Sequence, residues 1–353
     1  MRPLLLSLAL CMCSPGHAAD GVQDRPAADA ALNRDEQLLM QPQLPVLEQR
    51  AALRRLAEGA MARRDFAKAA DSASRYLKLG GNDPDVKALL TVALYRSKRY
   101  ADAARALQSE IYAAEHTGQA PSEERLRWLL DCYEQLGDKT GARWVLGRLV
   151  VHHTKREYWM ALLQTVEVPE RLRLDVQRLR LATDSMVTAG DYIAMADLAG
   201  RQGWPGEARK VLDAGFAAGV LGAGADAARH RQLREQAARH AADDLQRLSA
   251  PEAEARARAE SDGLALVTLG FGFITHGQSG KGIPLMEAGL RKGVHGIPQD
   301  SKIRLAIAYL WSGQKTKAME LLRTVAGRHG AGDVARLWEW FILTAEPGAA
   351  GSR

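Results

Sequence analysis

Apolar and polar positions follow one another along this chain in a pattern that repeats. The segments LAEGAMARRDFAKAADSASRYL and LTVALYRSKRYADAARALQSEI each carry apolar residues at helical spacing. When the two segments are aligned, three pairs of matching residues lie 34 positions apart: Leu56 and Leu90, Phe66 and Tyr100, Ala69 and Ala103. Small residues where two backbones approach, with large apolar residues between the helices, are typical of an antiparallel helix pair. A repeat of this length predicts a stack of such pairs.

Four later segments carry the same pattern of leucines, small residues and a glycine-containing turn: LLDCYEQLGDKTGARWVL, MADLAGRQGWPGEARKVL, LGFGFITHGQSGKGIPLM and LAIAYLWSGQKTKAMELL. On these residues the chain resembles the tetratricopeptide repeat (TPR) family over about 290 residues. The resemblance implies an all-α fold: a right-handed solenoid of about eight or nine antiparallel helix pairs. The first helix of each pair is then expected to line a concave surface.

Two stretches depart from the pattern, and the second of them separates the two expected repeat arrays. Pro169 stands where the other units have a glycine turn, and residues 225–261 are rich in Ala, Arg and Glu with almost no large apolar residue after Leu248. The expected organisation is a signal peptide over 1–18, a flexible leader over 19–49, an N-terminal repeat array over 50–224, a polar helical joint over 225–261, a C-terminal array with a cap over 262–345, and a disordered tail over 346–353.

The stretch MRPLLLSLALCMCSPGHAAD has the three parts of a secretory signal: a basic start at Arg2, an apolar run, and small residues before a cleavage point. The apolar run is too short to cross a bilayer core of about 30 Å. We therefore expect export by a cleaved signal peptide, a periplasmic location, and no membrane span in the mature chain. A lipid anchor is disfavoured, because large residues precede both Cys11 and Cys13. Cleavage leaves Cys132 without a disulfide partner, and its apolar helical surroundings predict a buried thiol.

The formal net charge of +6 is small for 353 residues. The two densest basic stretches, 171–180 and 229–240, interleave Arg with Leu or Ala at helical spacing. We interpret both as solvated helix faces, because a nucleic-acid surface would concentrate basic residues together with stacking aromatics. No nucleic-acid partner is expected.

Side chains with catalytic or metal-binding potential form no recognisable site in the sequence. His152 and His153 are adjacent, so they point to different faces of a helix and lack further ligands at a suitable spacing. The glycine-rich segment GFGFITHGQSGKG lacks the residue order of a phosphate loop, and helix packing explains its glycines better. The sequence predicts no metal site, no cofactor and no enzymatic activity.

Offsets from the leucine of each first helix predict which side chains face the concave surface. In the first and third units these positions are polar, and in the last two units they are apolar. Soluble proteins seldom leave a large apolar surface open, so the apolar wall is expected to bind a partner or to be covered. The candidate partner-binding residues are Arg54, Glu58, Arg127, Asp131, Val267, Phe271, Ile274, Ile303, Ile307, Leu310 and Trp311.

The segment ARLWEWFILT, residues 335–344, places Trp338, Trp340 and Phe341 near the end of the chain. In one interpretation, residues 333–344 form an amphipathic capping helix that closes the array and covers part of the apolar wall. In the other, the wall or these aromatic side chains stay partly open and bind a helix or extended segment of another protein. The two interpretations can hold together, because a cap can leave a groove beside it.

The segments GWPGEA and GLRKGVHGIPQDSKIRLAIAYLWSGQKTKAMELLRTV carry a further resemblance, over residues 155–345, to periplasmic TPR proteins of Gram-negative bacteria. Some of those proteins accompany TonB–ExbB–ExbD energy-transduction systems. The resemblance implies a periplasmic scaffold or adaptor that binds another cell-envelope protein, with TonB–ExbB–ExbD components as candidate partners in outer-membrane transport. Two alternatives stay open: a periplasmic TPR component of a polysaccharide-secretion apparatus, and a cell-wall-modifying accessory protein or enzyme.

Overall fold

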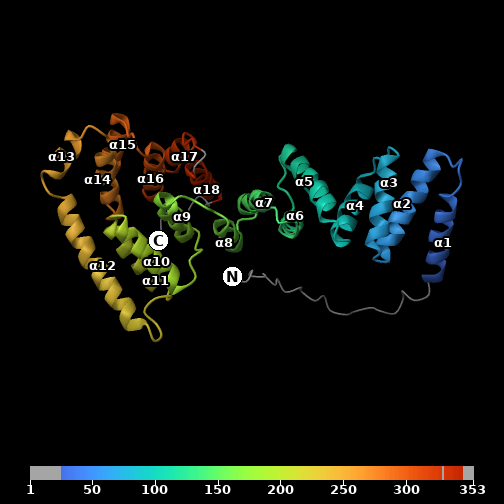
Figure 1. Cartoon of the computed structure of the whole chain (residues 1–353), viewed down its shortest axis with the longest axis horizontal. Helices are drawn as coiled ribbons and strands as arrows, with labels where there is room; N and C mark the ends of the chain where they lie inside the picture. Colours follow the sequence, from blue (N-terminus) through green and yellow to red (C-terminus); the bar gives the residue numbers. More distant parts are fainter. Residues whose placement is uncertain (1–24, 328–329, 345–353) are drawn as a thin grey trace. The chain divides into compact units, whose positions relative to one another are not determined.

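The computed structural model describes residues 25–327 and 330–344, and this part of the chain forms 18 α-helices and no strand. The predicted all-α fold of successive helix pairs is therefore confirmed (Figure 1). The expected signal peptide at 1–18 and the expected tail at 346–353 lie outside the described residues. Contacts divide the chain into two compact units, one within 1–118 and 131–137 and the other within 119–130 and 138–353. Each unit is described by itself.

The first unit is a run of helix hairpins. Its helices are α1 (Arg25–Leu38), α2 (Val46–Ala62), α3 (Phe66–Lys78), α4 (Pro84–Arg96), α5 (Tyr100–His116) and the second half of α6 (Glu123–Leu136). Fully buried Ala57 of α2 and Ala73 of α3 let these two helices approach closely. Asp65 caps α3 by accepting a hydrogen bond from the backbone N–H of Lys68 (3.1 Å), which satisfies a donor that the helix itself cannot.

Helix α1 lies where the sequence predicts a flexible leader. Leu32 is buried against Gly59 of α2, where a Cβ atom would lie only 2.6 Å from the Leu32 side chain. Arg55 of α2 forms an ion pair with Asp35 of α1. An exposed first hairpin would leave its apolar face in water, so α1 covers the start of the array as a terminal cap does.

The second unit holds the first half of α6 and the remaining helices, including the longest helix of the described chain, α12. The helices are α7 (Lys139–His152), α8 (Arg156–Gln164), α9 (Glu170–Ala182), α10 (Ala189–Arg201), α11 (Pro205–Ala217), α12 (Ala227–Leu248), α13 (Ala253–Ala259), α14 (Leu264–Thr275), α15 (Ser279–Lys292), α16 (Pro298–Trp311), α17 (Lys315–Leu322) and α18 (Ala331–Thr344). The expected polar joint at 225–261 corresponds to α12 and α13, which lie inside this unit.

Glycines allow helices α14 and α15 of the second unit to pack very closely. A Cβ atom on Gly270 would lie 2.6 Å from the carbonyl oxygen of Gly282, and one on Gly263 would lie 1.9 Å from that of Gly289. Only glycine allows the two backbones to approach in this way. The glycine-rich segment that superficially suggests a phosphate loop is therefore a helix-packing seam.

The C-terminal helices fold back on earlier helices of the same unit. In a simple repeat array each pair contacts only its neighbours. Here α14 contacts α11, α16 contacts α9, and α18 contacts both α7 and α9 (Figure 1). This arrangement decides which of the sequence-predicted surfaces are covered.

Candidate partner-binding groove

The predicted apolar wall of α14 and α16 is covered by the chain's own helices. Val267, Phe271, Ile274, Ile303 and Ile307 each expose 2% of their surface or less. Among the predicted wall residues, Leu310 is partly exposed and Trp311 is 44% exposed at the end of α16. Five of the candidate side chains therefore lie in the core of the second unit, and their contact with a partner stays a prediction that would require this core to open.

Phe271 shows what fills the wall. The ring of Trp204, at the start of α11, meets it edge to face with the ring centroids 5.0 Å apart. The guanidinium carbon of Arg178 lies 4.7 Å from the centroid of the same ring. An aromatic ring and a cation both bind favourably to a buried phenyl ring, so α9 and α11 occupy the place that sequence analysis considered for a partner.

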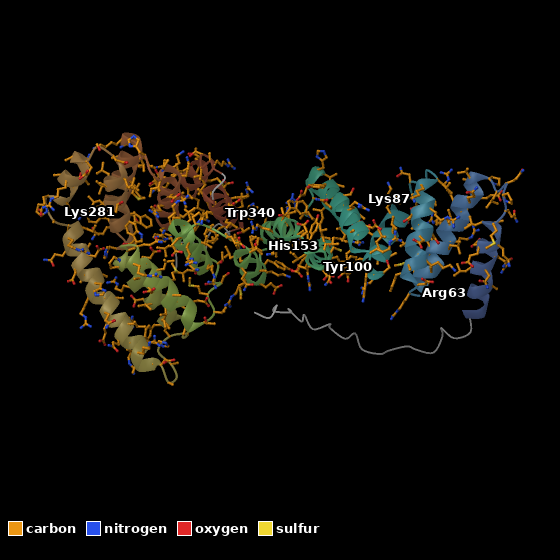
Figure 2. All side chains as sticks on the ribbon, in the orientation of Figure 1. Arg63, Lys87, Tyr100, His153, Lys281 and Trp340 are labelled. Atoms are coloured by element: carbon orange, nitrogen blue, oxygen red, sulfur yellow. The ribbon has the colours of Figure 1, made fainter. Side chains whose placement is uncertain are left out.

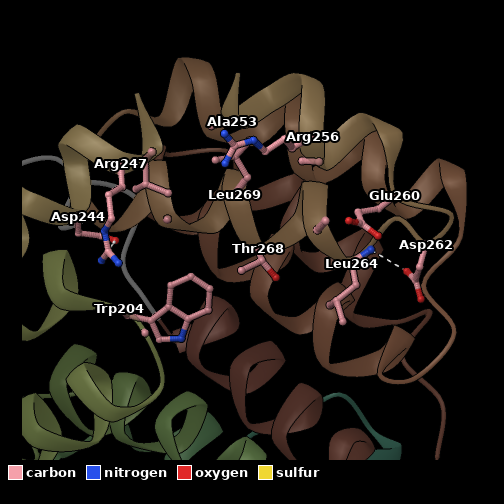
Figure 3. Close-up of a pocket in the computed structure, with 15 residues that line it drawn as sticks. Trp204, Asp244, Arg247, Ala253, Arg256, Glu260, Asp262, Leu264, Thr268 and Leu269 are labelled. Carbon is pink, nitrogen blue, oxygen red and sulfur yellow. Dashed lines mark hydrogen bonds and ion pairs between the residues drawn. The ribbon is translucent and has the colours of Figure 1, made fainter. Parts of the chain in front are cut away.

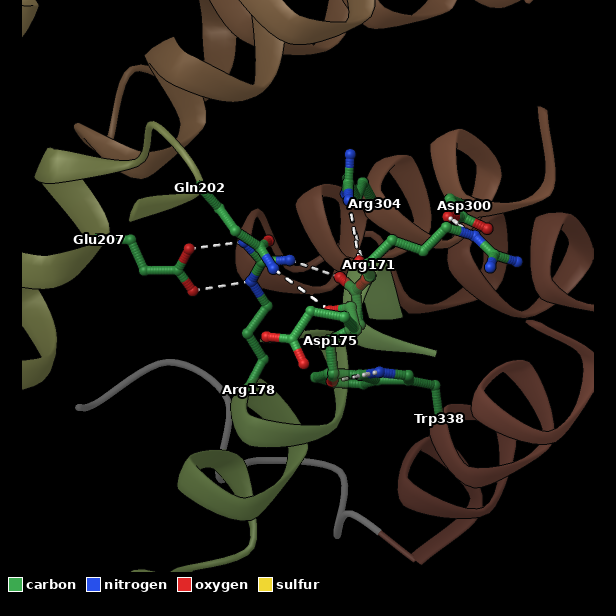
Figure 4. A network of polar contacts seen from close by, with 9 residues as sticks. Arg171, Asp175, Arg178, Gln202, Glu207, Asp300, Arg304 and Trp338 are labelled. Carbon is green, nitrogen blue, oxygen red and sulfur yellow. Dashed lines mark hydrogen bonds and ion pairs between the residues drawn. The ribbon is translucent and has the colours of Figure 1, made fainter. Parts of the chain in front are cut away.

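Arg178 also belongs to a buried polar network (Figure 4). Arg178 of α9 donates from Nε and Nη2 to the two carboxylate oxygens of Glu207 on α11, at 2.7 and 2.6 Å, and from Nη1 to Asp175. Burial disfavours the charged guanidinium, yet Glu207 and Asp175 raise the pKa of Arg178 above its ordinary value. The interpretation of 171–180 as a solvated face is wrong at these positions, because α9 is enclosed by helices that come later in the chain.

The network also joins α9 to α16 and α18. Trp338 donates its indole N–H to the backbone carbonyl of Asp175 (3.2 Å), and Arg171 pairs with Asp300 at 2.8 Å. Arg304 donates to the backbone carbonyl of Arg171 (3.3 Å). Burial raises the pKa of Asp300, and the cations of Arg171 and Arg304 oppose this. These bonds hold the C-terminal helices in one register against α9.

Helix α18 is the predicted capping helix. Trp338 is 1% exposed, and the Phe341 ring packs edge to face against the rings of Trp338 and Trp159, with centroids 5.6 and 6.4 Å apart. Trp340, labelled in Figure 2, lies against Gly147 of α7, where a Cβ atom would come within 2.5 Å of the indole. Of the two interpretations of the C-terminal aromatics, the structure supports the cap.

The polar candidates lie on helices α2 and α6. Arg54 forms ion pairs with Glu58 (2.8 Å) and Asp83 (2.5 Å), so each of these three charged side chains has an ion-pair partner within the chain. Asp131 accepts a hydrogen bond from the hydroxyl of Tyr95 at 2.9 Å, and Arg127 is exposed. Their part in binding stays a prediction.

An open groove lies elsewhere in the second unit, between α10 and α12 with α11 as its floor. Its volume is about 1070 Å³. Its apolar lining comes from all three helices: Ala194 is exposed, and the other side chains are buried or half-buried, namely Ile193, Ala196, Pro205, Ala208, Leu212, Leu233 and Ala237. The groove therefore combines an open mouth with an apolar floor.

A sequence signal for this groove exists. In the third unit, the predicted concave residues lie two positions before Leu129 (Arg127), two positions after it (Asp131) and five positions after it (Glu134). Gly203 is at the turn of the α10 unit, as Gly137 is at the turn of the third unit, so Met195 is the sequence equivalent of Leu129. The same offsets, counted from Met195, select Ile193, Asp197 and Gly200. All three line the groove. These three residues were not among the sequence-predicted candidates, because the offsets were counted only in units nearer the two ends of the array.

Charged side chains line the groove as well. Asp197 and Arg201 form an exposed ion pair on α10 (3.0 Å), and Arg247 pairs with Asp244 on α12 (3.2 Å). Arg229, His240 and Asp243 also line it from α12. A partner segment would therefore meet an apolar strip with charges at defined places.

A second cleft, of about 820 Å³, lies between α14 and the segment formed by the end of α12 and α13 (Figure 3). Trp204, Leu248 and Leu269 form its apolar part. Its rim has mixed charge: Arg256 pairs with Glu252 at 3.2 Å, and Asp262 accepts a hydrogen bond from the backbone N–H of Leu264 at 2.7 Å. That bond lowers the pKa of Asp262.

The described residues give little support for a metal-binding or catalytic site. They contain no group of three or more His, Cys, Asp or Glu side chains that could hold a metal ion. Burial raises the pKa of the Cys132 thiol to about 12, so this side chain is a poor nucleophile. Across residues 25–327 and 330–344, none of the helices combines the length and the apolar character needed to cross a bilayer.

Comparisons with known proteins give the following findings. No family model matches the chain, and no curated protein matches it. Among solved structures, it is similar to a crystal structure described as a tetratricopeptide repeat protein from Parabacteroides merdae ATCC 43184, with 11% sequence identity. The alignment covers 82% of this chain and 98% of that chain with a TM-score of 0.28.

Proposed function

We propose that this protein is a non-enzymatic scaffold that binds a segment of another protein in the groove between α10 and α12. The observation that carries the proposal is the groove itself, which is open while the apolar wall of α14 and α16 is filled. Packed helix pairs present rigid grooves between neighbouring helices, and a groove with an apolar floor and polar edges suits a protein segment.

The packing of the second unit supports this assignment. The buried Arg178 network and the α18 cap hold α9, α11, α16 and α18 together, so α10 and α11 rest on a rigid base. A groove built on rigid helices binds with little loss of conformational freedom on its own side. Binding energy then depends on how well the partner fills the apolar floor.

The finer proposal places this scaffold in the periplasm, as an adaptor for another cell-envelope protein in a TonB–ExbB–ExbD outer-membrane transport system. The N-terminal sequence pattern of a secretory signal supports export, and the resemblance over residues 155–345 supports the partner class. A polysaccharide-secretion apparatus is the alternative setting.

Site-specific photo-crosslinking in cells tests both levels of the proposal: the binding role of the groove, and the finer proposal of a periplasmic adaptor. A photo-reactive residue at Gln236, which lines the groove, should crosslink one defined envelope protein. The matched control is Gln246, an exposed glutamine on the same helix that does not line the groove. Mass spectrometry of the adduct identifies the partner.

The outcomes separate the levels. An adduct with an energy-transduction component or an outer-membrane receptor supports the finer proposal, and one with a secretion component supports the alternative. Equal background adducts at both positions would contradict a binding role for the groove.

A further inference from the structure

We propose that the groove between α10 and α12 takes an amphipathic helix whose two ends carry opposite charges about 21 Å apart. This inference rests on the proposed function, since it specifies the chemistry of the segment that the same groove binds.

The walls of the groove favour a helical occupant. The described part of the chain has no strand, so it offers no edge to complete the backbone hydrogen bonds of an extended peptide, whereas a helix satisfies its own. On the α10 side, Gly190, Ala194 and Gly200 line the groove with small side chains. A Cβ atom on Gly200 would meet no other atom within 4 Å, so a partner backbone can approach closely there.

The size of the groove agrees with this occupant. A helix about 21 Å long and about 10 Å wide fills on the order of 1,600 Å³ as a cylinder. The groove of about 1070 Å³ would hold most of its width and leave one polar face in water.

The middle of the groove is apolar. Ile193 of α10 and Leu233 of α12 line the two walls of the groove, and both are half-buried. Leu212 of α11 is buried in the floor between them. An occupant helix therefore needs apolar side chains at i, i+3, i+4 and i+7 on the face that meets this floor.

In the described part of the chain, two charged side chains without an ion-pair partner lie near the two ends of the α12 wall: Arg229 at one end, and Asp243 one turn before Arg247 at the other. Arg229 and Asp243 both line the groove, and within the described residues neither forms an ion pair. The other Arg and Asp side chains of the groove are paired within the chain, as described above. Fourteen residues of helix correspond to nearly four turns and about 21 Å, so Arg229 and Asp243 face the same side of α12. A bound helix gains most if it places an acid near Arg229 and a base near Asp243.

Three designed peptides test this charge pattern on the full-length mature chain. They share one helical sequence with an apolar face and differ only at two positions 14 residues apart, which carry Glu and Lys, Glu and Glu, or Lys and Lys. Binding is measured by fluorescence anisotropy at pH 8. We expect the Glu/Lys peptide to bind about three- to tenfold more tightly than either of the others, the range typical of partly exposed charge pairs.

Single substitutions should switch the preference in opposite directions. Arg229→Glu makes both ends of the groove acidic, so the Lys/Lys peptide should become the tightest binder. Asp243→Lys makes both ends basic, so the Glu/Glu peptide should take its place. Arg231→Glu is the matched control, because Arg231 is exposed on the same helix, forms no ion pair within the described residues and does not line the groove; its peptide ranking should match that of the unmodified chain.

An unchanged ranking in Arg229→Glu and Asp243→Lys, or the absence of binding by all three peptides, would overturn the inference. The crosslinking result then tells which level has failed. If Gln236 still crosslinks a defined partner, the scaffold function stands and only the charge pattern is wrong. If Gln236 crosslinks nothing specific either, both proposals are wrong.

Discussion

Replacing Phe271 with alanine tests whether the apolar wall of α14 and α16 is protein core. Phe271 exposes none of its surface, and it contacts Trp204, Trp311 and Arg178. Alanine would remove the ring from a site whose neighbours belong to several helices and are themselves held by the buried network. The structure therefore predicts a large loss of stability in the second unit.

The magnitude follows from two contributions. Returning a buried phenylalanine side chain to water costs about 2–3 kcal/mol, and the cavity left among rigid neighbours adds to this. The expected loss is about 3–5 kcal/mol, the usual range for this substitution in a core. Trp311→Ala is a matched control in the same aromatic cluster; because Trp311 is 44% exposed, its loss should be less than about half as large.

Hydrogen–deuterium exchange with mass spectrometry is the suitable assay. The chain has two compact units, so its denaturation is not expected to be a single two-state transition, whereas exchange reports each helix separately. In Phe271→Ala, protection should fall in α14 and also in α9 and α11, which cover the ring. The double substitution Phe271→Glu with Ile307→Glu should unfold these helices outright, because it buries two unpaired carboxylates.

The opposite result would refute the reasoning. If Phe271→Ala changed stability by less than about 1 kcal/mol and abolished partner capture, the wall would be an open interface in solution. The packing described here would then be one of two states of the second unit.

Three further predictions concern stability. Arg178→Met should cost about 3–5 kcal/mol by chemical denaturation followed by tryptophan fluorescence, because two buried carboxylates lose their cation; a loss below about 1 kcal/mol would contradict this account. Asp191→Ala should cost about 1–2 kcal/mol at pH 7, because Asp191 completes the capping box of α10. Burial opposes ionisation of Asp191, but hydrogen bonds lower its pKa below the ordinary value, so its stabilisation is present above that value and is lost as pH falls through the folded-state pKa. The melting difference from the unmodified chain should therefore shrink below about pH 4, and a difference that grew there would contradict the sign. Gly270→Ala should destabilise the α14–α15 pair by about 1–3 kcal/mol through a backbone clash, whereas Gly280→Ala, in open space on α15, should stabilise it slightly; equal melting temperatures would rule out the packing seam.

Much of the fold was predictable because its determinants are local. The glycines between paired helices, such as Gly203, Gly277 and Gly313, all have positive φ, a conformation that other residues adopt at a cost. The small residues at helix contacts and the apolar positions at helical spacing are equally visible in the chain. These features specify helices and hairpins whatever surrounds them.

The candidate site was only partly predictable. The concave positions of the α10 unit follow from the same offsets that select Arg127 and Asp131, so the sequence contains the α10 side of the groove. The α12 side was hidden, because the polar sequence of 225–261 carries no repeat pattern against which to count. Which wall would be open was not predictable from hydrophobicity, since the apolar wall is covered and the mixed groove is free.

Local sequence patterns specify a set of helices that pair with their neighbours, together with an apolar C-terminal segment that must be covered. The reason is that capping, turn formation and hairpin packing involve residues close together in the chain. Packing between helices determines that α9 and α11 fill the wall, that Arg178 is buried, and that the groove beside α12 stays open. The first two outcomes depend on contacts between residues far apart in the chain: Arg178 with Phe271, which are 93 positions apart, and Arg171 with Asp300 and Trp338 with Asp175, which are each more than 100 positions apart. These pairings depend on the register of whole helices rather than on any local pattern.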